Sequence, residues 1–348
     1  MHKIDLEQRI RMGEIIEDVD LSSADLEGAS LGGGIFQRVR LAGANLTGAD
    51  MRETVFSKCI FDGARMENAN LRQAVIEGSS LSSTLLVGAN LVNAKISGGT
   101  QRSVRLERAN LTIAAILDGD LSGANLSGAT LDRTTFLDES LAGVELGGTN
   151  LKQCIFLKAD LSTAKLTGAT FDMVIFTEAN LRGQKLAKQS FRLCQFGGAD
   201  LTEVDFRGAD LTQCNFKDAK LVKADLSEAK LVRALFATAN LAGALLVGAT
   251  LTQSVFQGAD LSGANLSAAK ADQCIFKRAK LPFATLCDAD LTYADFTHAD
   301  LTGADFRRAT LMRAQLHGSI QKDSHWSAGK VSALSVDPEL AEAEQFRS

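Results

Sequence analysis

The chain of 348 residues contains little proline, little aromatic variety and little net charge. It has two Pro, one Trp and one Tyr, and its 37 basic and 42 acidic residues leave a net charge of −5. So small a charge, combined with 45% hydrophobic residues, is not typical of a disordered chain. The mildly acidic balance also disfavours broad binding to the phosphate backbone of nucleic acids, which requires an excess of basic residues.

Long hydrophobic segments are missing as well. No apolar run approaches the roughly 20 residues that a membrane-spanning helix needs. The N-terminal segment MHKIDLEQRIRMGE is charged and lacks the apolar stretch of a secretory signal, so we expect no signal-dependent export. Against this background one count is high, because 18 Phe accompany the single Tyr and the single Trp.

A five-residue repeat runs through most of the chain. A large apolar residue returns at every fifth position from Ile16 to Leu316, at 61 positions without an insertion or deletion, and only Gln101 and Ala271 depart from it. A small residue, usually Ala, stands two positions earlier, and a polar residue stands between the two. Because side chains alternate along an extended backbone, we expect the small and the large residue to point inward and the polar one outward.

The repeat A-[D/N]-L-x-x, as in ADLSGANLSAAK and DADLTYADFTHADLTGADF, resembles the pentapeptide-repeat family over about residues 16–318. The resemblance implies an all-β fold, a right-handed quadrilateral β-helix with one pentapeptide on each side of the coil. With four pentapeptides per coil, the repeat region would form about 15 coils of a solenoid. Residues 1–15 are then expected to form an N-terminal cap, and residues 319–348 a C-terminal tail with a short helix.

The positions of the Phe residues support a four-sided coil independently of the resemblance. In the column formed by every twentieth position from Ile16 to Leu316, eleven of the sixteen members are Phe, whereas the other three columns are mostly Leu. A plain five-residue repeat gives no reason for this difference, but stacked four-sided coils do, because one wall keeps the same neighbours at every level. We therefore expect a filled core with a column of Phe along one wall.

The outer surface of this wall is expected to be apolar. The outward residue before each member of the Phe column should be polar, yet nine of these sixteen positions hold Ile, Val or Leu, beginning with Ile15. Large exposed apolar patches usually mark interaction sites. The alternatives are that β-branched residues simply suit this wall or that the tail folds over it. The candidate protein interface comprises Ile35, Val55, Val75, Leu117, Leu137, Ile155, Leu157, Ile175, Leu235, Val255 and Ile275.

The tail has its own pattern. Asp337 followed by Pro338 and ELAEAEQF predicts a helix N-cap with Pro at the first helical position. The tail either covers the last coil or binds a partner, which includes a second copy of the chain. The residues expected to make its contacts are Trp326, Leu334, Leu340 and Phe346.

The sequence shows no pattern for catalysis, for a cofactor or for a metal. Five of the six Cys occupy the small inward position and Cys287 an outward one, which favours reduced core thiols. Cys194 and Cys214 fall at equivalent positions of adjacent coils, so a disulfide between them is sterically conceivable. No metal-ligand spacing appears, and no His is paired with a nucleophile, although three of the four lie near the C-terminal end (His2, His298, His317 and His325).

We therefore expect a non-enzymatic scaffold that docks another protein, or a second copy, through the aliphatic surface or the tail. The family resemblance implies a bacterial cytoplasmic protein, and it extends to accessory proteins and effectors of bacterial secretion systems that leave the cell without a signal peptide. It also implies an alternative, a DNA mimic that binds and protects DNA gyrase. Mimicry needs a long face of one charge sign, but Asp20 and Asp120 share their column with Arg40 and Lys220.

Overall fold

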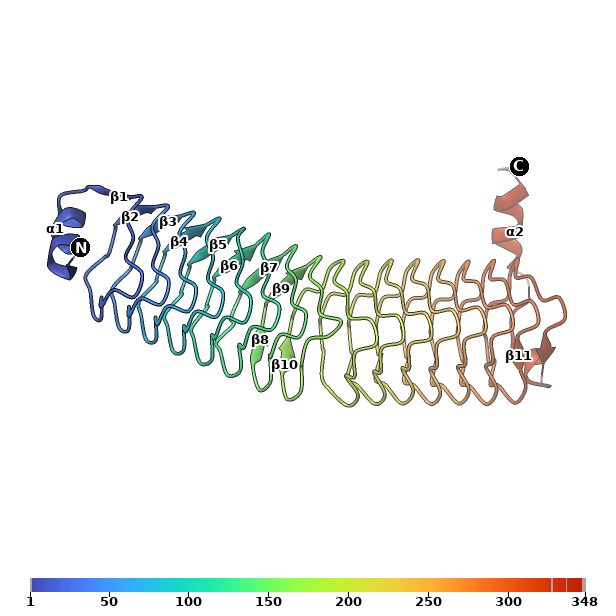
Figure 1. The fold of residues 1–348 in the computed structure, drawn as a ribbon. Coiled ribbons are helices and arrows are strands. Elements are labelled where there is room, and N and C mark those ends of the chain that lie inside the picture. The colour runs from blue at the N-terminus through green and yellow to red at the C-terminus, as the bar shows by residue number, and fades with distance from the viewer. Residues whose placement is uncertain (1, 327, 336, 346–348) are drawn as a thin grey trace. The chain divides into compact units, whose positions relative to one another are not determined.

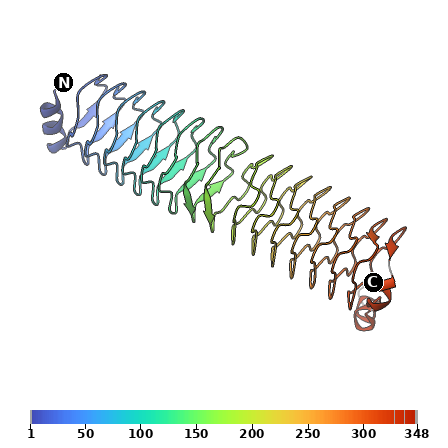
Figure 2. The same ribbon diagram turned by 90° about the horizontal axis from the view of Figure 1, so that it is seen from below.

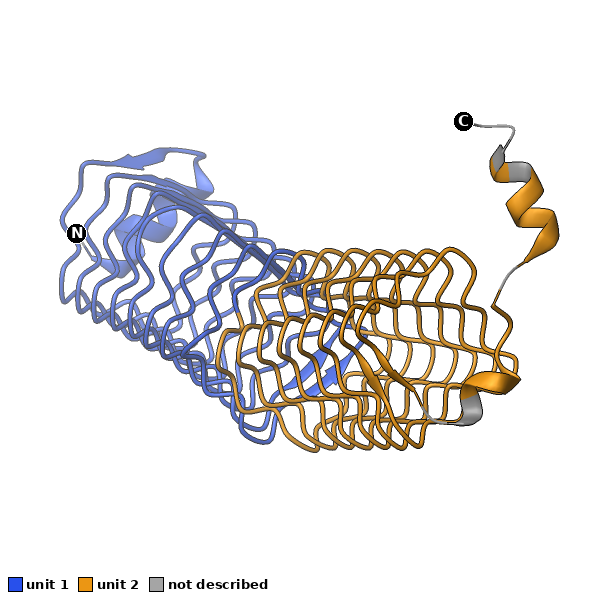
Figure 3. Ribbon diagram, turned by 90° about the vertical axis from the view of Figure 1, so that its right-hand side faces the viewer, with its two compact units in different colours: residues 1–180 blue, residues 181–348 orange. Residues whose placement is uncertain are grey.

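The structure is a computed structural model that describes residues 2–326, 328–335 and 337–345 (Figure 1). It comprises two compact units, residues 1–180 and 181–348, shown separately coloured in Figure 3. Within each unit the chain winds in successive coils (Figure 2). Each coil pairs in parallel with the next, as Asp20 does with Arg40. The expected quadrilateral β-helix is confirmed, with a short helix near each end of the chain.

Unit 1 begins with helix α1 (Lys3–Arg11) and contains an eight-stranded parallel sheet in the order β1-β2-β3-β4-β5-β6-β7-β9. Each strand pairs with the corresponding strand of the next coil, so that Phe36 lies beside Phe56. A second wall contains the pair β8 (Asn150–Lys152) and β10 (Thr170–Asp172). The strands of the large sheet are β1 (Ile15–Glu17), β2 (Ile35–Gln37), β3 (Val55–Ser57), β4 (Val75–Glu77), β5 (Lys95–Ser97), β6 (Ala115–Leu117), β7 (Thr135–Leu137) and β9 (Ile155–Leu157).

Unit 2 repeats the pairing mainly as single parallel bridges, for example between Leu235 and Val255. Near its end β11 (Asp305–Phe306) pairs in parallel with β12 (His325–Trp326). A 3₁₀ helix, η1 (Ala328–Ser332), and helix α2 (Pro338–Gln345) follow. The Asp337 carboxylate accepts hydrogen bonds from the amides of Glu339 and Leu340, both at 3.1 Å, which confirms the predicted N-cap.

The structure confirms the core residues that the five-residue repeat predicted. The large residue at every fifth position is buried, and so are the two exceptions, Gln101 and Ala271. In unit 2 the rings of Phe216 and Phe256 lie 4.8 Å and 4.7 Å from the ring of Phe236, with interplanar angles of 4° and 2°. Such parallel rings add a specific attraction to the burial of apolar area, so the Phe column stabilises one wall of the coil.

The polar residue of the repeat has a structural task at the corner of each side. Its side-chain oxygen accepts a hydrogen bond from the amide two residues later, as Asp120 does from Ser122 and Asp260 from Ser262, both at 2.9 Å. Asp and Asn are suited to this local turn because their short side chains reach the backbone two residues on. Many of the acidic residues are therefore part of the turn structure of the fold.

Helix α1 lies against the first coil of unit 1. Leu6 is fully buried and Ile10 is half-buried, whereas Ile4 on the same helix is 75% exposed. The Glu7 carboxylate accepts a hydrogen bond from the amide of Ser30 at 2.8 Å. The helix thus supplies partners for a sheet edge that would otherwise be open.

At the other end, pairing continues beyond residue 318, where the sequence register suggested that it stops. Phe306 pairs with Trp326, and their rings stack at 4.2 Å. Trp326 thereby takes the central inward position of a further partial coil. The polar Gln321 at the preceding central position hides this continuation in the sequence.

Candidate functional site

The candidate surface in unit 1 is the outer face of the large sheet. The first and third residues of each strand point to the same side, opposite the buried central residue. The first residues form a row in register from Ile15 through Ile35 and Val55. We call this surface the aliphatic face; it consists of Ile15, Ile35, Val55, Val75, Leu117, Leu137, Ile155, Leu157 and Ile175.

The side chains of the aliphatic face are only partly accessible. Ile15 is 48% and Ile35 39% exposed, and the other members are half-buried. Side chains stacked at each level cover their neighbours, because parallel strands lie only about 4.8 Å apart. The side chains of the aliphatic face therefore pack against one another and can adopt few rotamers. Such a surface is suited to an interface because little conformational entropy is lost on binding.

The densest part of the aliphatic face lies on β6, β7 and β9. Leu117 pairs with Leu137, and Leu137 pairs with Leu157, so three leucines stack in register. Ile155 and Ile175 extend the cluster on the neighbouring row. Exposed charged residues follow each leucine along the chain, namely Asp118, Asp138 and Lys158. An apolar centre with a polar rim is the usual anatomy of a protein interface.

In unit 2 the corresponding residues form a shorter row. Leu235, Val255 and Ile275 pair in register on successive coils. Leu235 is 44% and Ile275 38% exposed, whereas Val255 is half-buried. The structure thus places every predicted interface residue on the outer surface of its unit, in two neighbouring rows in unit 1 and one row in unit 2.

The tail residues are found in different environments. Trp326 is half-buried against Phe306, and the Lys330 ammonium lies 4.4 Å from the centre of its ring. Leu334 is 53% exposed, and its amide donates a hydrogen bond to the Ala314 carbonyl at 2.8 Å. Leu340 on α2 is half-buried. Phe346, the fourth predicted contact, lies outside the described residues.

Acidic side chains are paired locally with basic ones. Guanidinium groups lie two residues beyond their carboxylates, as in Arg207–Asp205 at 2.8 Å and Arg307–Asp305 at 2.6 Å. The hydrogen bond from Arg207 is the main cause that lowers the pKa of Asp205. The arginine side chains of these pairs are exposed whereas the carboxylates are buried or half-buried, and ion pairs with a solvent-exposed partner contribute little to stability. Their importance lies in the electrostatics, because they interrupt negative charge along the repeat.

The six cysteines, all in the described part of the chain, are thiols, and five of them are buried. Burial raises the pKa of Cys154 to about 12 and that of Cys214 well above its usual range. A protonated buried thiol is a poor nucleophile and a poor metal ligand. The expected core role of these thiols therefore agrees with their surroundings.

Sequence reasoning missed a buried polar site in unit 1. Gln101 replaces a core Leu, and its side-chain oxygen accepts a hydrogen bond from the amide of Asp120 at 3.2 Å. Its side-chain nitrogen donates to the Gly98 carbonyl at 2.9 Å. In the next coil the amide of Ser140 instead donates to a backbone carbonyl, that of Gly119. The Gln101 side-chain amide thus takes the place of one backbone hydrogen bond between adjacent coils.

Glu139 lies beside this site. It occupies a small inward position of the repeat and is only 2% exposed. One oxygen accepts a hydrogen bond from the amide of Gly119 at 2.8 Å, and the other has no hydrogen-bond partner among the described residues. Desolvation raises the pKa of Glu139 to about 7. The sequence register could have revealed this site, because Glu139 occupies a position of the repeat where Ala or Cys is usual.

Restoring the apolar repeat at Gln101 is expected to destabilise the protein. The variant Gln101→Leu leaves the Asp120 amide and the Gly98 carbonyl without their partner, at a cost of about 1–3 kcal/mol for each group that stays buried. Chemical denaturation of the variant and of Ala271→Leu, which changes another exception in the core without removing a hydrogen bond, gives the comparison. A gain in stability from Gln101→Leu contradicts the bonding role of the side chain.

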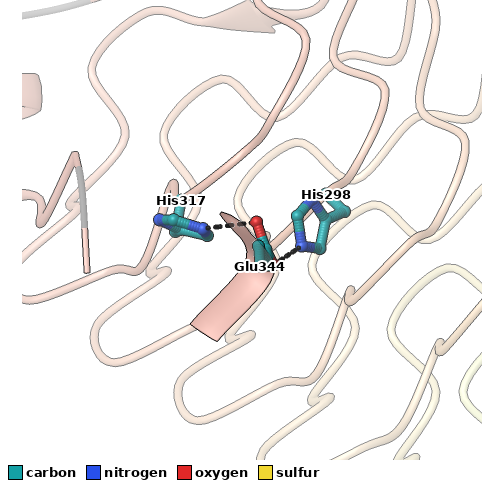
Figure 4. Close-up of side chains that lie close together, drawn as sticks. All are labelled: His298, His317 and Glu344. Atoms are coloured by element: carbon teal, nitrogen blue, oxygen red, sulfur yellow. Dashed lines mark hydrogen bonds and ion pairs between the residues drawn. The ribbon is translucent and has the colours of Figure 1, made fainter. Parts of the chain in front are cut away.

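A second group that the sequence did not reveal lies in unit 2. His298, His317 and Glu344 each place a potential ligand atom within 4.8 Å of the others. The close-up shows the three side chains side by side (Figure 4). The two histidines come from adjacent coils, and the glutamate comes from α2. His325, which the sequence placed in the same region, is not part of this group.

Profiles of pentapeptide repeats match the chain at residues 20–57, 35–73, 64–100, 120–156, 145–183, 259–292, 272–308 and 289–320, and a profile of the pentapeptide repeat region matches residues 189–266. A search of curated proteins finds no match. None of the helices in the described part of the chain has the length and hydrophobicity that a membrane crossing requires.

Among solved structures, a trypsin-treated form of QnrB1, a plasmid-mediated fluoroquinolone resistance protein, is 18% identical. The match covers 63% of this chain and 95% of QnrB1, with a TM-score of 0.29. HetL, a pentapeptide repeat protein involved in heterocyst differentiation regulation in the cyanobacterium Nostoc, is 22% identical. That match covers 93% of this chain and 94% of HetL, with a TM-score of 0.16.

Proposed function

The chain belongs to the pentapeptide-repeat family, and we propose that it is a non-enzymatic scaffold that binds another protein through its aliphatic face. The observation that carries the proposal is the in-register stack of Leu117, Leu137 and Leu157 on the large sheet. β-Branched residues suit any strand, so they explain part of the row, but leucine has no such preference. An accessible apolar surface of this regularity is typical of a binding site.

The partner is either a different protein or a second copy of the chain, and the tail is the second candidate contact. The setting that we propose, on the family resemblance, is the bacterial cytoplasm. A secretion-associated accessory or effector role fits a scaffold of this kind. The expectation that the protein is no enzyme belongs to the same proposal.

The DNA-mimic alternative receives less support from the side chains. Mimicry of a duplex needs uncompensated negative charge at regular spacing. Here Asp50, Asp205 and Asp305 each face an arginine two residues later at 2.6–2.8 Å. The basic side chains therefore reduce the negative potential at several levels of the repeat.

The test of the scaffold is the double variant Leu137→Asp/Leu157→Asp. We expect partner capture or self-association to weaken at least about tenfold, equivalent to about 1.4 kcal/mol, because two charges would be buried in an apolar contact. The readouts are the mass in solution by light scattering and the yield of co-purified partner. Leu85→Asp changes a half-buried outward leucine on another wall and serves as the matched control.

Two adjacent aspartates could disturb the sheet itself. The variant Leu137→Thr/Leu157→Thr removes apolar area with a residue that strands favour, and circular dichroism checks the fold of each variant. If folded forms of both double variants keep wild-type association and partner capture, the aliphatic face is not an interface.

A further inference from the structure

The group formed by His298, His317 and Glu344 fastens helix α2 to the coils of unit 2. The Glu344 carboxylate lies between the two rings, with one oxygen 2.7 Å from His298 Nε2 and the other 3.3 Å from His317 Nε2 (Figure 4). The ring centres are 5.5 Å apart, and the rings are nearly perpendicular. The His317 side chain is 9% exposed, whereas His298 and Glu344 are accessible from solvent at 29% and 42%.

We propose that these three residues bind a divalent cation of the zinc class and that the bound ion locks α2 onto the solenoid. Two imidazoles and one carboxylate, with water in the fourth position, are a well-known ligand set of Zn²⁺. Mg²⁺ and Ca²⁺ prefer oxygen ligands throughout, so a site with two nitrogens selects against them. This inference does not depend on the aliphatic face.

The geometry allows the site to close with small movements. Zinc–ligand distances of about 2.0–2.1 Å place tetrahedral ligand atoms about 3.3 Å apart. The three potential ligand atoms already lie within 4.8 Å of one another. His298 and His317 are held on adjacent coils by the backbone hydrogen bond from the His298 amide to the His317 carbonyl, at 2.8 Å. Glu344 is an exposed side chain on a short helix, so it can supply most of the adjustment.

The hydrogen bond between the Asp337 amide and His317 opposes cation binding. His317 Nδ1 accepts a hydrogen bond from the amide of Asp337 at 3.1 Å, so the proton of the neutral ring is on Nε2. A cation at Nε2 displaces that proton, and a proton on Nδ1 would then face the Asp337 amide. Binding therefore breaks the Asp337 contact and shifts the start of α2, while Glu344 holds the helix through the ion.

The consequence is a tail that is held differently with and without the ion. Without it, α2 is attached by the hydrogen bonds of Glu344 and Asp337 to the two histidines. With it, the ion is held by His298 and His317 on the coils and α2 is attached through the Glu344–ion bond, so opening of the helix requires that this bond breaks. Because an ion that binds only the docked state stabilises that state, α2 should open less often.

The experiment is calorimetric titration of the full-length protein, first freed of metal with a chelator, with ZnCl₂ and separately with MgCl₂. We expect one Zn²⁺ per chain and no saturable Mg²⁺ binding. Glu344→Gln and His298→Gln should each weaken Zn²⁺ binding at least about tenfold. Glu342→Gln on the same helix and His325→Gln on β12 remove the same chemical groups outside the site and should bind as the wild type does.

A second measurement addresses the coupling to α2. Amide hydrogen exchange of residues 337–345 should slow when Zn²⁺ is added to the wild type, and this effect should be lost in Glu344→Gln. Circular dichroism confirms that the variants keep the solenoid. The proposal is overturned if the wild type shows no saturable Zn²⁺ binding, if the control variants lose as much affinity as the site variants, or if the double variant His298→Gln/Glu344→Gln still binds Zn²⁺ like the wild type.

Discussion

Replacing Phe236 with Ala is expected to lower the free energy of unfolding by about 3–5 kcal/mol. The ring is fully buried between Phe216 and Phe256, at 4.8 Å and 4.7 Å. The coils on either side are fixed by backbone hydrogen bonds, such as that from the Phe236 amide to the Val255 carbonyl at 2.7 Å. The wall cannot collapse into the cavity, so the lost contacts of both neighbours add to the lost burial.

Denaturation with urea measures this loss, with Gln257→Ala as a control at an exposed position of the next coil. Because each coil of a solenoid contacts only its neighbours, hydrogen exchange should speed up first in the coils that contain Phe216 and Phe256. A loss below about 1 kcal/mol would show that the wall relaxes and that the Phe stack is not a principal source of stability.

The second large effect concerns pH. The pKa of Glu139 is raised to about 7 from an ordinary 4.5, mainly because the carboxyl is buried. Between these values the unfolded chain has already lost the proton that the folded chain retains, so stability falls as the pH rises through this window. Glu139→Gln should therefore match the wild type at pH 4 and be more stable by up to about 3 kcal/mol at pH 8.

Glutamine keeps the oxygen that accepts the hydrogen bond from the Gly119 amide, so the variant removes the charge and leaves this contact. The measurement is urea denaturation at several pH values between 4 and 8. Glu77→Gln, which removes a surface carboxylate from β4, is the control. If both variants change the profile equally, the effect reflects the net charge of the chain and not the burial of Glu139.

The repeat made the fold predictable from the sequence to an unusual depth. A period of five determined which side chains are buried, and the Phe at every twentieth position determined which side chains stack. The helix start at Asp337 and Pro338 followed from local backbone chemistry. These features depend on neighbours that are close in sequence or one coil away, which a periodic pattern encodes.

The features that the sequence did not reveal depend on contacts outside the period. In the sequence Gln101 is only a departure from the repeat, whereas in the structure its side-chain amide replaces a backbone hydrogen bond between coils. His298 and His317 do not occupy equivalent positions of their coils, and Glu344 approaches them only because the tail returns to the coils. For the aliphatic face, the sequence predicted its residues, but their register and partial burial come from the structure.

The most direct test of the central claim is site-specific photo-cross-linking in the native host. A photoreactive amino acid is placed at position 137 on the aliphatic face and, in separate experiments, at position 85 on another wall and at position 340 on α2. The scaffold account predicts a protein adduct from position 137 and none from position 85. It is contradicted if position 137 gives no adduct while position 85 or position 340 does, whether the adduct is a gyrase subunit or another protein.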